Sequence, residues 1–341
     1  MKKAILVMAV SILAAGCADN SIPRADLPEL DLSNPLLAEW DTPHATPPFS
    51  RIELKDYEPA FDAAIACSRA EVEAIVRNPR KPTFMNTIVA LERQGALLNR
   101  IAGVFFNLMS ADTSDEMQQI AERVQPKLTA LSNDISLNPE LFARVKAVYE
   151  HPGRKLSTED RRLLEKTYRS FVRAGALLGA DEKARLAEIN SELALASVKF
   201  GNNLLAENYN FTMELEPEQM TGLPAGVQEQ AREKARELGK GNKGVFTLQK
   251  PSMIPFLTYS PDRELRERIY TAYLNRCNRG DEYDNKQLIN DFIRLRTEKA
   301  HLLGYPSYAA YVVDDQMAGT TEAVYDLLEG VWAPALESAK R

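Results

Sequence analysis

The chain has 341 residues, 45% of them hydrophobic and 26% charged, which is typical of a globular protein and excludes a compositionally disordered one. Its net charge of −6 and the lack of any basic run argue against nucleic acid as a partner. Three cysteines, Cys17, Cys67 and Cys277, are too few and too scattered for a disulfide framework.

The first 17 residues are predicted to be a lipoprotein signal peptide. Two lysines precede an apolar run over residues 4–15, which is too short to span a bilayer as a mature helix. The run ends in Ala14-Ala15-Gly16-Cys17, which resembles the bacterial lipobox, so we expect lipid on Cys17 and anchoring to a membrane surface. The alternative is an ordinary signal peptide with a chance cysteine. Because Ala18 is not acidic, the resemblance implies the outer membrane, with the protein facing the periplasm.

Residues 18–33 are predicted to be a polar tether, and the body of the protein is expected to begin at Asn34. The segment over residues 34–48 is rich in proline, so it should lie extended over that body. From Tyr57 to residue 208, helical spacing of apolar residues predicts six helices with short connections. We expect one of these helices to continue without a break from Thr83 to Leu108.

Polar residues that cap helices predict where several of these helices begin. Thr113 is followed three residues later by Glu116, which predicts a capping box. Asn138 and Ser157 are expected to cap the next two helices. Gly179 is expected to end the helix that starts at Ser157.

The stretch from Asp181 to Leu215 organises the rest of the chain. Its apolar residues recur at intervals of three and four up to residue 208, which predicts a long amphipathic helix. Alternation of apolar and polar residues then predicts a strand over 209–215. Residues 245–259 are strand-like again, although two prolines favour an edge or bent strand. The expected fold is therefore mainly α, with a small β-sheet insertion.

Helices are predicted again around the second strand and after it. A short charged helix lies near residues 227–238, and Asp262 is expected to cap a helix that runs through Arg279. Further helices are expected over residues 284–303 and 308–313, and Thr320 is expected to cap the last one.

Several segments resemble the blocks of one peptidase family, in the order in which that family has them. The blocks are Ile189-Asn190-Ser191-Glu192-Leu193, Val198–Asn203 with Glu207-Asn208, Thr83–Thr87, Val104–Leu108, Tyr259–Arg266, Glu298–Tyr305 and Val313–Ala318. They are similar to the thimet-oligopeptidase-like zinc metallopeptidases, and most to the bacterial peptidyl-dipeptidase (dipeptidyl carboxypeptidase) branch. The resemblance covers roughly residues 34–341.

The resemblance implies a neurolysin-like fold, in which two helical halves enclose a deep channel that admits short peptides. This chain would form one half of that ellipsoid. Residues 34–208 would be its N-terminal helical domain, and residues 209–341 would be the start of the catalytic domain. The implied activity is the release of C-terminal dipeptides from short peptides, with zinc as the cofactor of the full-length family enzyme.

The zinc-binding motif of that family is not in this sequence. The family holds zinc through His-Glu-x-x-His, whose two histidines lie on one helix face while the glutamate acts as general base. The only histidines are His44, His151 and His301, and no two of them are close. We therefore expect this chain to contain no metal ligand and no catalytic residue. The interpretation is a channel wall, truncated before the zinc motif, that is inactive without a missing C-terminal catalytic half.

Other patterns have a structural interpretation beside a functional one. Glu298 and His301 form the E-x-x-H pair that di-iron bundles use, but without a second such pair a helix-surface pair is favoured. His44 is interpreted as a loop residue because no further ligand follows at metal-binding spacing. Cys67 and Cys277 could join in an exported protein, although buried free thiols are favoured.

A series of tyrosines is expected to pack helices, with ligand stacking as the alternative. These are Tyr259, Tyr270, Tyr273 and Tyr283.

Two functions stay open at this point. The chain is predicted to be the N-terminal part of an exported, lipid-anchored zinc peptidyl-dipeptidase, with short peptides and the missing half as partners. The alternative is a non-catalytic helical lipoprotein that binds peptides or a partner protein. The first hypothesis predicts an exposed apolar surface that favours association. The face expected to carry it consists of Val324, Leu327, Leu328, Val331 and Trp332.

Overall fold

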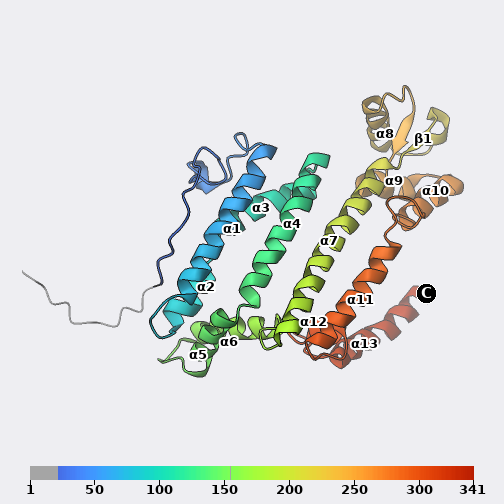
Figure 1. The fold of residues 1–341 in the computed structure, drawn as a ribbon. Coiled ribbons are helices and arrows are strands. Elements are labelled where there is room, and N and C mark those ends of the chain that lie inside the picture. Colours follow the sequence, from blue (N-terminus) through green and yellow to red (C-terminus); the bar gives the residue numbers. More distant parts are fainter. Residues whose placement is uncertain (1–21, 154) are drawn as a thin grey trace, which may run out of the picture. The chain divides into compact units, whose positions relative to one another are not determined.

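A computed structural model describes residues 22–153 and 155–341, and helices dominate it (Figure 1). The prediction of a mainly α fold with one small sheet is confirmed. Within the described residues, no helix combines the length and apolar character needed to cross a bilayer. The predicted signal peptide and the lipidation site Cys17 lie outside the described residues.

The chain divides into two compact units. Among the described residues, unit 1 consists of residues 22–111, 131–153 and 155–177, and unit 2 consists of residues 112–130 and 178–341. The helix α4 (Asp115–Ser136) passes from one unit into the other. The domain boundary expected after residue 208 came from the family resemblance, and it stays a prediction.

The helices of unit 1 follow one another with short connections. They are the 3-10 turn Pro43–Ala45, α1 (Leu54–Val76), the π-helix Phe84–Val89, α2 (Ala90–Arg93), α3 (Ala96–Ala111), α5 (Pro139–Glu150) and α6 (Thr158–Arg173). As predicted, the side chains of Asn138 and Ser157 accept hydrogen bonds from the first turns of α5 and α6.

Aromatic side chains hold α1 against α3. The ring of Phe105 is fully buried and lies edge-on to Tyr57, Phe61 and Phe106, with ring centroids 4.9, 5.4 and 5.1 Å away. A second cluster joins the end of α1 to the π-helix, α5 and α6, and it includes Ile75. These two clusters form the core of unit 1.

Two arginines fix the irregular segments of unit 1 to its helices. Arg100 on α3 donates to the carbonyl oxygens of Leu36 and Ala38, at 2.9 and 3.1 Å, and its guanidinium lies over the ring of Trp40. Arg144 on α5 donates to the carbonyl oxygen of Asn78 at 2.9 Å. The proline-rich segment is therefore bound to the body through backbone carbonyls that would otherwise have no partner.

The helix predicted over residues 83–108 is broken. Thr83 caps its start as expected, but the chain turns at Gln94 and Gly95 before α3 begins at Ala96. Gly95 has a φ of +75°, which is the left-handed conformation that glycine adopts without steric cost. Its backbone N–H donates to the Glu71 carboxylate at 2.8 Å. Periodicity did not reveal this break because the apolar spacing continues across it.

Two predicted helix ends are also corrected. Ser114, and not Thr113, accepts the hydrogen bond from the first turn of α4, from the backbone N–H of Met117 at 3.2 Å. The helix that starts at Ser157 ends at Arg173 and is followed by Gly175, which has a φ of +97°. Gly179 instead precedes the first residue of the next helix. In each case a neighbouring residue of the same chemical type fulfils the role.

Unit 2 is built on the long helix α7 (Ala180–Asn210), which lies beside α11 (Lys286–Leu302) (Figure 1). Its other elements are β1 (Met213–Leu215), the 3-10 turn Pro217–Met220, α8 (Ala225–Glu237), β2 (Gly244–Phe246), α9 (Lys250–Tyr259), α10 (Arg263–Leu274), α12 (Tyr308–Val313) and α13 (Thr321–Lys340). Asp262 and Thr320 cap α10 and α13 as predicted. The helix after Asp262 ends at Leu274, five residues before the predicted end at Arg279.

The two predicted strands are much shorter than expected. They form an antiparallel pair in which Met213 lies opposite Phe246, while residues 209–210 belong to α7 and residues 250–259 form α9. Pro251 lies in the first turn of α9, where its missing N–H leaves no helical hydrogen bond unmade. Proline was interpreted as a sign of a bent strand, but here it starts a helix.

The sheet belongs to a small core of its own. Side chains from both strands pack with α8, α9 and α10 in one cluster; they include Met213, Leu215, Phe246, Phe256 and Ile269. A Cβ atom at Gly244 would clash with the sulfur of Met220, so a larger residue there would force that buried side chain to shift.

Candidate functional site

Three of the seven segments that suggested a family in the sequence lie on α7 and α11, which contact each other and the loop over residues 275–285. At the start of α7, Arg185 forms a two-pronged ion pair with Glu298 of α11, through Nε to Oε1 at 2.6 Å and Nη2 to Oε2 at 2.9 Å. Arg185 also donates to Glu188 on its own helix at 2.9 Å. The guanidinium holds the pKa of Glu298 below its usual value.

One turn further along, Lys299 of α11 donates from Nζ to the side-chain oxygen of Asn190 at 2.7 Å. Burial lowers the pKa of Lys299 because the charged ammonium loses water there. Asn190 belongs to the Ile-Asn-Ser-Glu-Leu block, so this asparagine binds a half-buried lysine.

The C-terminal end of α7 is tied to the loop after α10. Asn203 donates to Asn285 at 2.8 Å, and Asn285 in turn donates to the carbonyl oxygen of Phe200 at 3.2 Å. Glu207, which is only 3% exposed, forms an ion pair with Arg279. These contacts keep residues 208–210 helical although their sequence alternates like a strand.

Asn208 completes this set. Its side-chain oxygen accepts from Arg276 at 2.8 Å, and the Arg276 guanidinium lies 3.7 Å from the ring centre of Tyr273. The asparagines and the glutamate of the family blocks therefore join elements of unit 2. We call these contacts, from Arg185–Glu298 to Asn208–Arg276, the α7–α11 polar interface. Each of these polar side chains is engaged by a partner from another element, so the chemistry of the interface is that of hydrogen-bonded support.

Sequence reasoning missed the partners on the other side of this interface. Arg185, Arg276, Arg279 and Asn285 were not singled out, because a charged or amide residue on a helix or loop resembles a solvated surface residue in the sequence. The only available signal was the unusual density of asparagine and glutamate on one long helix.

The candidate metal ligands do not converge. Glu298 is occupied by Arg185, and His301 is exposed. His44 and His151 are exposed as well, and His44 lies in the turn before α1. Among the residues that the structure describes, no three histidine, cysteine or acidic side chains are placed to hold a metal ion. The donor set of these residues does not fit a zinc site, so no catalytic step is assigned to zinc on them.

The cysteines and tyrosines have mixed outcomes. Cys67 and Cys277 are free and buried, as favoured, and burial raises the pKa of each thiol. Tyr273 packs against the small core around the sheet, as expected. Tyr259 and Tyr270 are about half exposed, so the expectation that all four tyrosines pack helices is wrong for these two.

An exposed apolar face runs along α13 at four of the five predicted residues, while the fifth, Val324, is half-buried. Leu327, Leu328, Val331 and Trp332 are between 56% and 69% exposed, and no residue of this helix is buried. On α11, Ile289 and Ile293 lie four residues apart on one face and are 46% and 62% exposed. Self-association through the exposed face of α13 stays a prediction.

Comparison with known proteins agrees with the blocks found in the sequence. Residues 256–341 match the family model described as Peptidase family M3. The chain is 38% identical to the dipeptidyl carboxypeptidase of Salmonella typhimurium over 305 residues, which are 89% of this chain and 45% of that protein. It is 38% identical over 308 residues to the dipeptidyl carboxypeptidase of Escherichia coli, with 90% and 45% covered.

More distant relatives include oligopeptidase A from several bacteria. The chain is 29% identical to oligopeptidase A of Haemophilus influenzae over 307 residues, which are 88% of this chain and 44% of that protein. In each of these comparisons the chain spans less than half the length of the relative.

Proposed function

Because this chain belongs to peptidase family M3, we propose that it forms part of the wall of a peptide channel in a zinc peptidyl-dipeptidase. The observation that carries the proposal is the 38% identity to dipeptidyl carboxypeptidases across about nine tenths of the chain. Short peptides are the proposed substrates, and release of C-terminal dipeptides is the proposed reaction of the complete site.

The zinc-binding groups of that site are proposed to come from outside these 341 residues. The three histidines are far apart in the sequence, and no pair has the spacing that lets two imidazoles bind one ion from a single helix face. The role proposed for this chain is structural: the α7–α11 polar interface keeps the long helices rigid, so that a channel lined by them keeps its width.

Dipeptide release from a chromogenic tetrapeptide, in the presence of zinc, tests this proposal. The purified full chain should show no release. Co-expression with the portion of the Salmonella dipeptidyl carboxypeptidase that this chain does not match should give a zinc-dependent rate. Stoichiometric zinc uptake with turnover by the chain alone would overturn the proposal. A stable complex that binds peptide without turnover would favour the non-catalytic peptide-binding lipoprotein instead.

We also propose that the protein is exported and carries a lipid on Cys17. The support is the sequence of residues 1–17, in which a short apolar run ends in a lipobox-like Ala-Ala-Gly-Cys. Metabolic labelling with an alkynyl fatty acid should mark the protein in the outer-membrane fraction, and Cys17→Ala should abolish the label. Equal labelling of the wild type and of Cys17→Ala would refute lipidation at this residue.

A further inference from the structure

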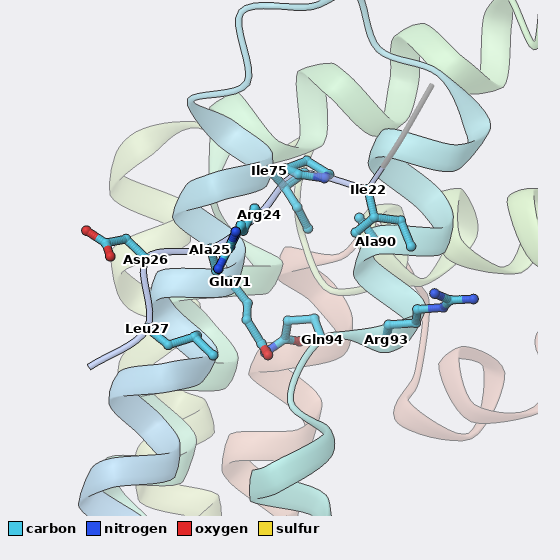
Figure 2. A pocket seen from close by; sticks show the side chains of 11 residues that line it. Ile22, Arg24, Ala25, Asp26, Leu27, Glu71, Ile75, Ala90, Arg93 and Gln94 are labelled. Atoms are coloured by element: carbon cyan, nitrogen blue, oxygen red, sulfur yellow. The ribbon is translucent and has the colours of Figure 1, made fainter. Parts of the chain in front are cut away.

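Part of the segment predicted to be a polar tether packs against unit 1. Residues 22–27, which we call the strap, run beside α1 and α2, and the half-buried side chain of Ile22 packs against the core cluster that contains Ile75 and Ala90 (Figure 2). Because residues 18–33 were predicted to form one polar tether, this contact was not expected. It divides the tether into a bound and an unbound portion.

Few contacts hold the strap against α1 and α2. A pocket of about 520 Å³ remains between the strap and the helices, lined from below by Glu71, Arg93 and Gln94 (Figure 2). The Glu71 carboxylate already accepts the Gly95 N–H, and Gln94 already donates to Ser68. Among the described residues no hydrogen bond joins the strap to α1 or α2, so its apolar contact centres on Ile22.

A second and firmer attachment follows at Asn34. The side chain of Asn34 donates to the carbonyl oxygen of Asp56 at 2.8 Å and accepts the N–H of Leu36 at 2.9 Å. Leu36 is fully buried, and Arg100 donates to its carbonyl oxygen. The chain is therefore bound weakly at Ile22 and strongly from Asn34 onward, with the exposed Leu32 between the two points.

The two attachment points permit very different distances from a lipid on Cys17. Five residues separate Cys17 from Ile22, and fully extended they span at most about 17 Å. With the strap released, the reach extends to Asn34, which is 17 residues away and allows at most about 60 Å. Burying the half-buried side chain of Ile22 contributes only a small stabilisation, and the entropy lost on ordering the strap opposes it, so little free energy holds the strap in place.

We propose that the strap is a reversible attachment that sets how far unit 1 stands from the membrane that carries the lipid on Cys17. The docked strap holds unit 1 against the phospholipid surface, and the released strap lets it move away. This inference rests on the proposed lipidation of Cys17.

Energy transfer in the lipid-anchored full chain tests the distance. A donor dye is placed on unit 1 at Arg161→Cys, which is exposed on α6, while Cys67 and Cys277 stay unlabelled because they are buried. Acceptor-labelled lipid is added to vesicles of phosphatidylethanolamine and phosphatidylglycerol. Ile22→Asp should lower the transfer efficiency, because a buried charge cannot replace the isoleucine. Leu32→Asp, the matched control in the same tether, should not change it.

Trypsin cleavage after Arg24 tests the strap without any lipid. In the full chain, Ile22→Asp should speed this cleavage roughly fivefold, and Leu32→Asp should leave it unchanged. Equal rates for Ile22→Asp and the wild type would overturn the strap. The lipid on Cys17 is first confirmed by mass spectrometry. If Ile22→Asp is then cleaved faster but shows unchanged energy transfer, the strap does not set the distance between unit 1 and the membrane. If the fatty-acid label does not appear on the protein, lipidation of Cys17 is refuted. The trypsin experiment then still tests whether the strap docks on unit 1.

Discussion

The ion pair between Glu207 and Arg279 predicts an unequal response to two substitutions of the same kind. Glu207 is 3% exposed, while the side chain of Arg279 is 41% exposed. Arg279→Gln leaves a carboxylate buried without its cation, whereas Glu207→Gln leaves a guanidinium that can turn to water. Arg279→Gln should therefore lower the free energy of unfolding more than Glu207→Gln does.

The size of the difference follows from the exposure. Two unit charges 4 Å apart at an effective dielectric constant of 20 attract by roughly 4 kcal/mol, and the partial exposure of Arg279 reduces that value. We expect Arg279→Gln to cost about 2–3 kcal/mol of unfolding free energy. Glu207→Gln keeps an oxygen acceptor toward Arg279 and should cost about 1 kcal/mol.

Urea unfolding followed by circular dichroism gives both numbers. Hydrogen exchange of the last turn of α7 shows where the stability is lost, which matters because the two units can unfold separately. Arg268→Gln is the matched control, since Arg268 is exposed on α10 of the same unit. An Arg279→Gln cost equal to or smaller than that of Glu207→Gln would refute the reasoning from burial.

Four further predictions concern other parts of the fold. Burial lowers the pKa of Lys299 from 10.5, so the unfolded chain binds that proton more tightly and the free energy of unfolding in urea should rise with pH just below 10.5. Lys299→Met should flatten this rise, while Lys199→Met at an exposed position of α7 should not. Phe105→Ala should cost about 3–5 kcal/mol in urea unfolding, against less than about 0.5 kcal/mol for the exposed Phe49→Ala. Gly95→Ala should cost about 1–2 kcal/mol through its positive φ alone, because a Cβ there has room, and a neutral thermal midpoint would contradict this. Cys67 and Cys277 should react with a thiol reagent only after urea unfolding, since both are buried with raised pKa values; rapid reaction in the native protein would show that they are accessible.

The starts of several helices could be predicted from the sequence because the contacts that fix them are local. Asn138, Ser157, Asp262 and Thr320 cap the helices that their sequences indicated, since a side-chain oxygen and the next turn's N–H groups are only three residues apart. The exposed face of α13 was also visible in its apolar spacing. The family blocks were identifiable in the sequence, and the relatives confirm them.

The errors occurred where a contact distant in the sequence decides the local conformation. Residues 208–210 alternate like a strand, yet Asn208 and Glu207 are held by Arg276 and Arg279, some 70 residues later, and the helix continues. Residues 250–259 contain two prolines and no helical periodicity, but burial of Met253 and Phe256 in the core around the sheet makes them a helix.

The sequence by itself determined the mainly helical class, the family blocks and the lack of a zinc-binding pair, since each depends on residue types and short spacings. Only the tertiary structure decided what the blocks do: Asn190, Asn203 and Glu207 support neighbouring elements, because partners from distant segments satisfy their polar groups at low exposure. The structure also decided that the tether is bound at Ile22, since a single apolar residue in a polar linker shows its role only beside the core that it meets.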